Sequence, residues 1–287
     1  MGRIPGPSRW VAASSSATRL ARTWRAQACS RSPVASVLGP LAGRGLCVLI
    51  ASPRHTAEDL EVWEVEERTD ALHAQRVNFK KKARDAMAEM AKFIPGGPGY
   101  LGVSWGKDSV VVAHLAWLLA QCGGPSFPVV WVRVDARENP DCPLVRDAFL
   151  REHPGTVYDE IDAAIPEIGL TSSLGFEEAA RRYGDRHISG VRAAESAVRK
   201  LRTMRWGLST ERTCAPIAWW STRDVFAYMH QESLPVHPAY ACSMGNIYPR
   251  EHLRVAALGG KRGQGFGRSE WEDHYYPEET QLIRSPS

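Results

Sequence analysis

The sequence predicts an α/β protein in which a Rossmann-like parallel sheet carries helices on both faces. Beyond residue 98, short β-branched stretches alternate with longer helical patterns, and such alternation implies a parallel sheet covered on both sides. The run PVVWVRV at Pro128–Val134 has the continuous apolar character of a strand buried on both faces. A strand also leads directly into a glycine-containing loop and an apolar helix at 100–121, which is typical of ligand-binding α/β folds.

The expected elements follow in order along the chain. A charged helical segment occupies 58–97, with Ala83, Met87 and Met90 spaced as one helix face, and it ends at the run IPGGPG. Strands are expected at 100–104, 128–134, 156–161 and 186–190, and helices at 109–121, 141–152, from about 193, and 221–231. Ser221, followed three residues later by Asp224, resembles a capping box at the start of the last of these helices. The nucleotide-binding domain is expected to span 98–240, and residues 241–287 are expected to form an irregular tail.

The positive charge of the chain is concentrated at its N-terminus. The 287 residues carry a formal charge of +4, yet residues 1–57 contain eight arginines and no Asp, Glu or Lys. The rest of the chain therefore has 28 basic and 32 acidic residues, which argues against nucleic-acid binding except through this leader. We expect the leader to be disordered. An upstream extension, an organellar transit peptide and a nucleic-acid tether remain open.

The six cysteines are single residues without a C-x-x-C pair: Cys29, Cys47, Cys122, Cys142, Cys214 and Cys242. From this spacing we expect no zinc site, no iron–sulfur cluster and no disulfide framework, and therefore a reducing, cytoplasmic location. The sequence contains no apolar run of 18 or more residues, so we expect no membrane partner.

The strongest functional signal is the loop SWGKDS at 104–109, between a predicted strand and a predicted helix. Such a turn directs backbone N–H groups and the positive end of the helix dipole at one point, which favours an anion. Ser104 and Gly106 are small enough for close approach of an anion. Lys107 adds a positive charge, and Ser109 can cap the helix or donate to a phosphate. The spacing differs from the Walker-type loop G-x-x-x-x-G-K-[ST].

This loop resembles the S-x-G-x-D-S loop of the ATP-pyrophosphatase (PP-loop) and phosphoadenosine-phosphosulfate (PAPS) reductase group. The family often has a second glycine where this chain has Trp105. The resemblance implies a fold of the adenine nucleotide α-hydrolase type. It also implies that Ser104, Gly106, Lys107, Asp108 and Ser109 contact phosphates or brace the loop.

Two further stretches extend the resemblance. The run GVRAAESAVR at 190–199 is similar to the family signature G-[IV]-R-x-x-E-S-x-x-R, and it places Arg192 and Arg199 where they can bind a phosphate or sulfate, with Glu195 holding Arg199. The stretches from Pro216 to Tyr228 and from Leu234 to Tyr240 resemble the third characteristic region, in which His237 is a candidate site residue. Asp135 follows the second strand, where it can reach the nucleoside, flanked by Arg137 and Glu138.

The reductase signature is incomplete in this chain. A sulfonucleotide reductase of this family carries its nucleophilic cysteine in a C-terminal E-C-G-x-H motif, and no such motif is present. Cys214 and Cys242 are the candidates for a relocated nucleophile, although an inert buried cysteine is the ordinary role of such residues.

These observations predict an enzyme that binds ATP or PAPS and acts at the α-phosphate or sulfate side. Lys107, Arg192 and Arg199 are the expected catalytic residues because they can stabilise developing charge. Mg²⁺ is implied if ATP is the substrate. Two alternatives are a thioredoxin-dependent PAPS reductase and a non-catalytic nucleotide-binding subunit of a sulfur-transfer or DNA-modification assembly. Lys261, Arg262 and Arg268 in the tail are either part of a lid over phosphates or part of a plain terminus.

Overall fold

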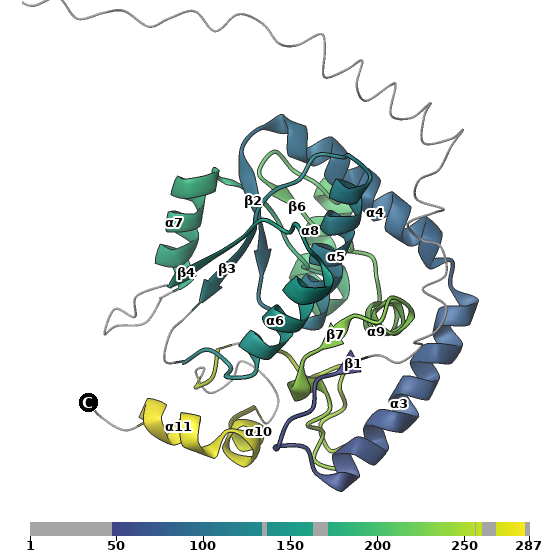
Figure 1. Ribbon diagram of the computed structural model, residues 1–287, viewed down its shortest axis with the longest axis vertical. Coiled ribbons are helices and arrows are strands. Elements are labelled where there is room, and N and C mark those ends of the chain that lie inside the picture. The colour runs from purple at the N-terminus through teal and green to yellow at the C-terminus, as the bar shows by residue number, and fades with distance from the viewer. Residues whose placement is uncertain (1–47, 134–136, 163–171, 256, 260–267, 285–287) are drawn as a thin grey trace, which may run out of the picture. The chain divides into compact units, whose positions relative to one another are not determined.

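The computed structural model describes residues 48–133, 137–162, 172–255, 257–259 and 268–284. All of them belong to one compact unit, residues 42–287. Within these ranges, no helix is long and apolar enough to cross a membrane. The helices and strands of Figure 1 are β1 (Val48–Leu49), α3 (Ala57–Arg76), α4 (Phe79–Phe93), β2 (Gly99–Val103), α5 (Lys107–Gln121), β3 (Val129–Arg133), α6 (Cys142–Glu152), β4 (Tyr158–Asp162), α7 (Ser172–Tyr183), β5 (Arg186–Ile188), α8 (Ala197–Trp206), β6 (Thr213–Cys214), α9 (Thr222–Gln231), β7 (Pro235–Val236), α10 (Arg268–Tyr275) and α11 (Pro277–Arg284).

The central sheet has five parallel strands in the order β4-β3-β2-β5-β6. The chain lays down β2, β3 and β4 in one direction and then returns to place β5 on the other side of β2. The strand order therefore reverses between β2 and β5, and open α/β sheets bind ligands at such a switch point, outside the carboxyl ends of the strands. The structure confirms the predicted Rossmann-like parallel sheet.

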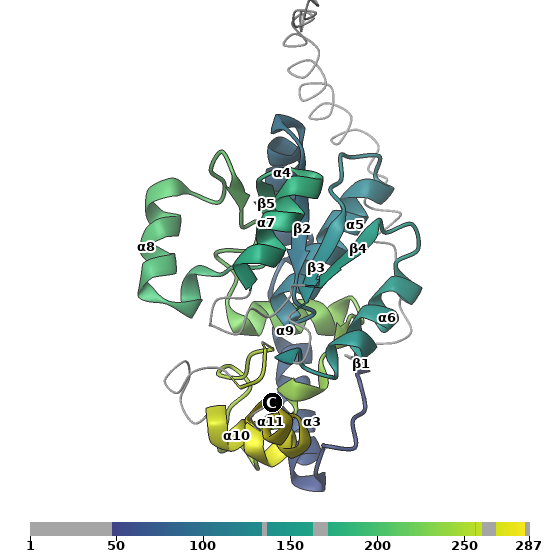
Figure 2. The same ribbon diagram turned by 90° about the vertical axis from the view of Figure 1, so that its left-hand side faces the viewer.

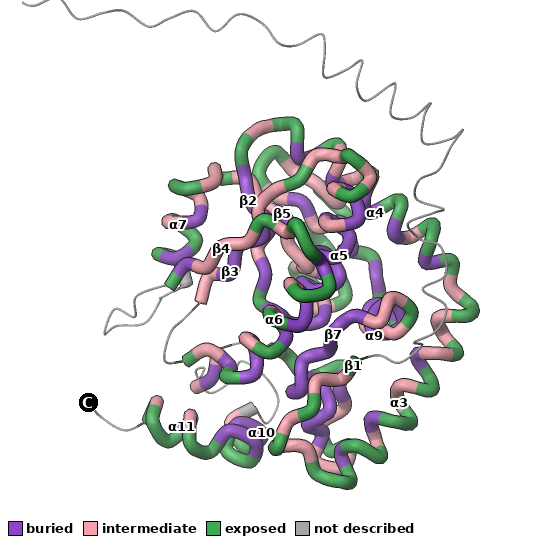
Figure 3. Tube along the Cα trace, in the orientation of Figure 1, coloured by how far each residue is buried: buried purple, intermediate pink, exposed green. Residues whose placement is uncertain are grey.

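Helices cover both faces of this sheet (Figure 1). On one face, α7 packs on β2, β3 and β4 over a cluster of Tyr100, Val130, Ile161 and Ala179. On the other face lies α5, which packs against α4 and α9. Helix α5 has eleven buried residues, because both its sides lie against other elements, as Figure 3 shows by its largely buried trace.

Helices α3 and α4 are joined to α9 by polar contacts as well as by apolar packing. Asp224 caps α9 together with Ser221, and its carboxylate also binds Lys82 Nζ at 2.7 Å and His73 Nε2 at 3.0 Å. Burial raises the pKa of Asp224, but these hydrogen bonds outweigh it and lower the pKa to about 2. The ionised carboxylate therefore stabilises the folded state at pH values above the pKa of Asp in the unfolded chain.

We expect Asp224→Asn to lower the free energy of unfolding at pH 7 by about 2 kcal/mol, because folding lowers the pKa of Asp224 from its usual 3.8 to about 2. A folded-state pKa below the unfolded value stabilises the fold at neutral pH, and this contribution disappears as the pH falls from about 4 to about 2. Urea unfolding at pH 7 and pH 3 measures the effect, and the difference between wild type and variant should shrink at pH 3. Asp185→Asn, at a largely exposed carboxylate paired with Arg212, is the control. A difference that does not change with pH would contradict this role of the charge.

Two predicted boundaries differ from the structure. Residues 48–57 belong to the predicted disordered leader, yet β1 pairs in parallel with β7, and Arg54 binds Asp141 at 3.2 Å and Glu279 at 2.7 Å. A two-residue strand and a single arginine leave no periodic pattern to detect. Residues 1–47, which include the rest of the predicted leader, lie outside the described residues.

The predicted irregular tail contains two helices, α10 and α11. Trp271, Tyr275 and Tyr276 of this region are buried, and Tyr275 Oη donates to both carboxylate oxygens of Asp59 at 2.9 Å. The tail is therefore held by aromatic and polar contacts with residues far away in the sequence, which local sequence patterns do not report. Helix α7 and strand β6 were also not predicted.

Candidate functional site

The loop between β2 and α5 lies at the switch point of the sheet and is shaped by Trp105. This residue adopts a left-handed conformation, with φ of +56°, which costs roughly 1–2 kcal/mol for a residue with a side chain. Its fully buried indole packs against Trp131, Phe149 and Tyr158, with ring centroids 5.7–6.4 Å apart. Aromatic burial therefore offsets the backbone cost at the position where the resembling family often has glycine.

Ser109 holds the two ends of the loop together. Its Oγ donates to Gly106 O at 2.9 Å and accepts from Ser104 N at 3.3 Å. Ser104 is exposed, whereas Gly106 and Ser109 are buried. Of the two roles expected for Ser109, the structure shows the bracing one. Helix α5 begins with Gly106 as its N-cap, so the first N–H groups of the helix have no partner within the helix.

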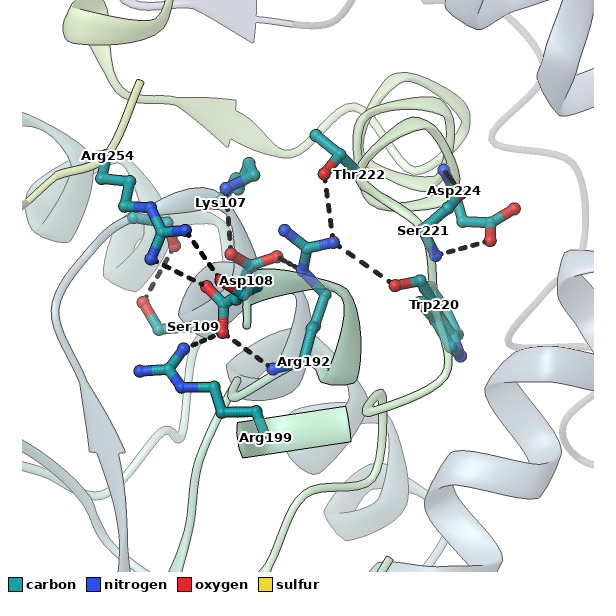
Figure 4. A network of polar contacts seen from close by, with 12 residues as sticks. Lys107, Asp108, Ser109, Arg192, Arg199, Trp220, Ser221, Thr222, Asp224 and Arg254 are labelled. Atoms are coloured by element: carbon teal, nitrogen blue, oxygen red, sulfur yellow. Dashed lines mark hydrogen bonds and ion pairs between the residues drawn. The ribbon is translucent and has the colours of Figure 1, made fainter. Parts of the chain in front are cut away.

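Asp108 joins the two principal cations of the site (Figure 4). Its Oδ2 lies 3.0 Å from Lys107 Nζ, and its Oδ1 lies 2.6 Å from Arg192 Nε. Both cationic side chains are at most 4% exposed. Two buried positive charges therefore share one carboxylate, and the cluster keeps a net charge of +1 beside the positive end of α5.

Neighbouring polar groups keep Lys107 charged. Burial lowers the pKa of Lys107, but Tyr240 and Asp108 outweigh burial and raise it above its usual value. The Lys107 backbone N–H donates to Tyr240 Oη at 3.2 Å, and Lys107 Nζ lies 5.1 Å from the centre of the Tyr240 ring. The phenol of Tyr240 therefore contacts both the backbone and the side chain of Lys107.

Arg192 reaches the site from the loop that follows β5. Its Nη1 donates to Trp220 O at 3.3 Å and to Thr222 Oγ1 at 3.1 Å. The guanidinium is therefore held through Nη1 by these two residues and through Nε by Asp108. The approach of this loop to α5 depends on Gly190. A Cβ at this position would lie only 2.7 Å from the Asp108 carbonyl carbon and 2.9 Å from Ser109 N.

Glu195 organises a second, more exposed set of arginines. Its carboxylate accepts from the Arg192 N–H at 3.0 Å and forms an ion pair with Arg199, so the i,i+4 pair expected from the sequence is present. Burial raises the pKa of Glu195, but these hydrogen bonds and nearby guanidiniums lower it overall. Arg199 is 40% exposed and lies on the outer side of the carboxylate rather than beside Asp108.

The segment that contains Arg254, Val255 and Leu258 lies against the loop between β2 and α5. Arg254 Nη1 lies 3.8 Å from Glu195 Oε1, and a Cβ on Gly106 would lie 3.4 Å from Val255 Cβ. Leu258 N donates to Arg137 O at 2.6 Å. The segment thus touches the chain after β2, after β3 and after β5, which places it across the carboxyl edge of the sheet.

Several predicted residues take other places. His237 is buried, its Nδ1 accepts from Ala239 N at 3.1 Å, and burial lowers its pKa to about 3, so it is a neutral structural residue. Arg137 is exposed, and Glu138 contacts Cys142 Sγ at 3.6 Å. Asp135, Lys261 and Arg262 lie outside the described residues, as does the side chain of Arg268.

The two candidate nucleophilic cysteines are inside the protein. Cys214 and Cys242 are fully buried. Burial raises the pKa of Cys214 to about 12 and that of Cys242 well above its usual value. Both side chains are therefore neutral thiols, which are poor nucleophiles.

Tyr240 and Arg254 were not identified as site residues from the sequence. Tyr240 ends the stretch that resembles the third family region, and this match was the available signal. Arg254 has no motif around it and is brought to the site by tertiary structure alone.

Comparisons with known proteins find likenesses among solved structures. No protein-family model matches the chain, and no curated protein matches it. Among solved structures, the chain is similar to the U34-tRNA thiolase NcsA from Methanococcus maripaludis with its [4Fe-4S] cluster. The match has 15% identity and a TM-score of 0.37, and it covers 71% of this chain and 76% of NcsA. A likeness of this size does not decide what this chain binds or catalyses.

The comparison does correct the exclusion of an iron–sulfur cluster. That expectation rested on cysteine spacing, and NcsA is a structural match that has a [4Fe-4S] cluster. Spacing is a poor basis for the exclusion because folding can bring cluster ligands together from distant segments. In the described part of the chain, no group of three or more His, Cys, Asp or Glu residues is arranged to hold a metal ion. Cys29 and Cys47 lie outside it.

Proposed function

We propose that the chain is an enzyme of the PP-loop ATP-pyrophosphatase type, which binds ATP at the carboxyl edge of β2 and β5. The observation that carries the proposal is the Asp108 bridge at the switch point of the sheet. One carboxylate holds Lys107 and Arg192 within 3.0 Å at the start of α5, where backbone N–H groups and the helix dipole also favour an anion. The resemblance of 104–109 and 190–199 to two signatures of this group supports the same conclusion.

In the proposed reaction, a nucleophilic group of an acceptor attacks the α-phosphorus of ATP. A bond forms between the acceptor and the α-phosphorus, and the bond to the bridging oxygen of the β-phosphate breaks. Pyrophosphate leaves with that electron pair, and the acceptor becomes adenylated. Lys107 and Arg192 stabilise the negative charge that develops on the phosphate oxygens, while Asp108 holds both cations in position before ATP arrives.

Burial of the two candidate nucleophiles, Cys214 and Cys242, makes the ATP reaction a better fit than PAPS reduction. A reductase must bring a thiolate to the sulfate sulfur, and neither Cys214 nor Cys242 is exposed. A product assay on the full chain separates the two reactions. We expect AMP and pyrophosphate from ATP with Mg²⁺, with water as the acceptor in this assay, and no sulfite from PAPS with reduced thioredoxin. Sulfite release that disappears in a Cys214→Ser, Cys242→Ser double variant would overturn the proposal in favour of the reductase.

We expect Arg192→Ala to weaken ATP binding by about tenfold or more, because a hydrogen-bonded charge next to a phosphate contributes about 1.5–3 kcal/mol. Arg192→Lys should recover only part of the affinity, since lysine keeps the charge but loses the planar fork that binds Asp108 and Thr222 together. Isothermal titration calorimetry with ATP measures both variants. Arg181→Ala, at an exposed arginine on α7, is the control. Unchanged affinity in a folded Arg192→Ala variant would remove this residue from the site.

A further inference from the structure

Helix α8 presents apolar side chains to solvent. Val198, Leu201 and Met204 are 65–76% exposed, and their spacing of three residues places them in one stripe along the helix. No residue of α8 is buried. Figure 2 shows the helix at one side of the molecule, away from α5 and α6.

This apolar stripe is flanked by positive charge. Residues 197–206 contain Arg199, Lys200, Arg202 and Arg205 and no acidic residue. Arg199 is paired with Glu195. In the described ranges, the other three bases of the helix form no ion pair with an acidic side chain of their own chain. A partner for α8 must therefore be apolar along its middle and acidic at its edges.

The outer face of α3 carries exposed apolar and acidic side chains, together with one exposed arginine, Arg68. Val65 and Leu72 are 61% and 56% exposed, and Leu60 is also exposed. Glu58, Glu61 and Glu64 occupy exposed positions of the same helix. Glu64 forms an exposed ion pair with Arg68 at 3.3 Å, a surface pair that an arginine of α8 can replace at little cost. The inner face of α3, which contains Asp59, Trp63 and Asp70, is buried against the rest of the protein.

The N-terminal segment of the same chain does not fit α8. Residues 1–47 contain seven arginines and no acidic residue, so their charge has the same sign as that of the helix. Charge complementarity within this sequence instead pairs α8 with α3, and these helices carry opposite charge in every copy of the protein.

We propose that α8 of one copy packs on the outer face of α3 of a second copy. Leu201 and Met204 contact Val65 and Leu72 at the centre, and Arg202 and Arg205 face Glu61 and Glu64. A two-fold axis repeats the contact, so that the α3 face of the first copy receives α8 of the second. This arrangement doubles the buried area and closes the assembly as a dimer.

Charge reversal in both helices tests this dimer. Sedimentation velocity on the full chain should give about twice the 31.8 kDa mass of one chain. Arg202→Glu with Arg205→Glu should return the mass to that of the monomer, and so should Glu61→Arg with Glu64→Arg. An equimolar mixture of the two variants, or a chain carrying all four substitutions, should restore the dimer. Arg181→Glu on α7 is the control and should remain dimeric.

Three results would overturn the proposal. The first is a wild-type chain that is monomeric at every concentration tested. This result would overturn the proposal whether or not nucleic acid is found to bind the basic helix α8 instead. The second is a dimer that neither pair of substitutions affects. The third is a change caused by the α3 substitutions alone, which would assign the acidic face to the arginine-rich N-terminal segment. ATP binding by the variants, measured separately, is expected to be unchanged, so this test is independent of the proposed function.

Discussion

Gly190→Ala is expected to abolish ATP binding and to destabilise the protein by about 1–3 kcal/mol, the usual cost of overpacking. The new Cβ would lie 2.7 Å from the carbonyl carbon of Asp108, 2.8 Å from its carbonyl oxygen and 2.9 Å from Ser109 N. All three are backbone atoms of the first turn of α5 and cannot rotate away. The loop after β5 must therefore move back, which separates Arg192 from Asp108 and opens the cluster that the proposed function requires.

Gly102→Ala is a matched control for this variant. Gly102 lies in β2, two residues before the loop, and a Cβ there would meet its nearest atoms at 3.7 and 3.9 Å, which are ordinary contacts. We expect it to bind ATP like the wild type. Calorimetry for binding and urea unfolding for stability measure both variants. A Gly190→Ala protein that is folded and binds ATP normally would show that close contact between the two loops is not needed.

Asp70→Ala is expected to lower the free energy of unfolding by about 3–5 kcal/mol, the usual cost of removing one partner from a buried ion pair. Asp70 on α3 accepts two hydrogen bonds from Arg250, at 2.6 and 2.7 Å, and both residues are buried. The Arg250 guanidinium also lies 4.1 Å from the centre of the Phe226 ring on α9. Without Asp70, Arg250 keeps Glu66, at 2.7 Å, as its one ionic partner among the described residues.

The pKa of Asp70 shows that the pair itself is not a strong source of stability. Burial raises this pKa more than the bonds from Arg250 lower it, so desolvation costs more than the ion pair returns. We therefore expect the double variant Asp70→Leu, Arg250→Met to be more stable than Asp70→Ala. Asp85→Ala, at an exposed i,i+4 pair with Lys81, should cost only about 0.3–0.5 kcal/mol. Urea unfolding of the three variants tests this order, and an Asp70→Ala variant no less stable than Asp85→Ala would contradict it.

Much of the candidate site was predictable because its chemistry lies in two short continuous segments. The segment 104–109 contains the loop, its bracing serine and the lysine, and 190–199 contains Arg192, Glu195 and Arg199. Residues at i and i+4 of one helix lie close together, and the Glu195–Arg199 pair was expected for this reason. In the structure the pair forms although Glu195 lies in a turn before Ser196, the N-cap of α8. The bridge from Asp108 to Arg192 joins these segments across the sheet, and no local pattern in either one predicts it.

Trp105 illustrates a different limit. From the sequence, it is a mild departure from a family that often has glycine in the loop. In the structure, its left-handed backbone is stabilised by an aromatic cluster from β3, α6 and β4. The partners that offset the backbone cost are 26–53 residues away in the sequence, so the departure could be noticed but not explained.

Local order along the chain was sufficient for the fold class and the position of the phosphate-type loop. Apolar periodicity, glycine placement and capping residues act over a few residues, and they can therefore be recognised in a single sequence. The tertiary structure decided the strand order, the convergence of Lys107, Asp108, Arg192 and Tyr240, the burial of Cys214 and Cys242, and the role of 48–57 and 268–284 in the fold. Each of these depends on contacts between segments that are distant in the sequence. The free energy of such contacts comes from shared burial and paired charges, and neither segment alone shows a periodic pattern that predicts them.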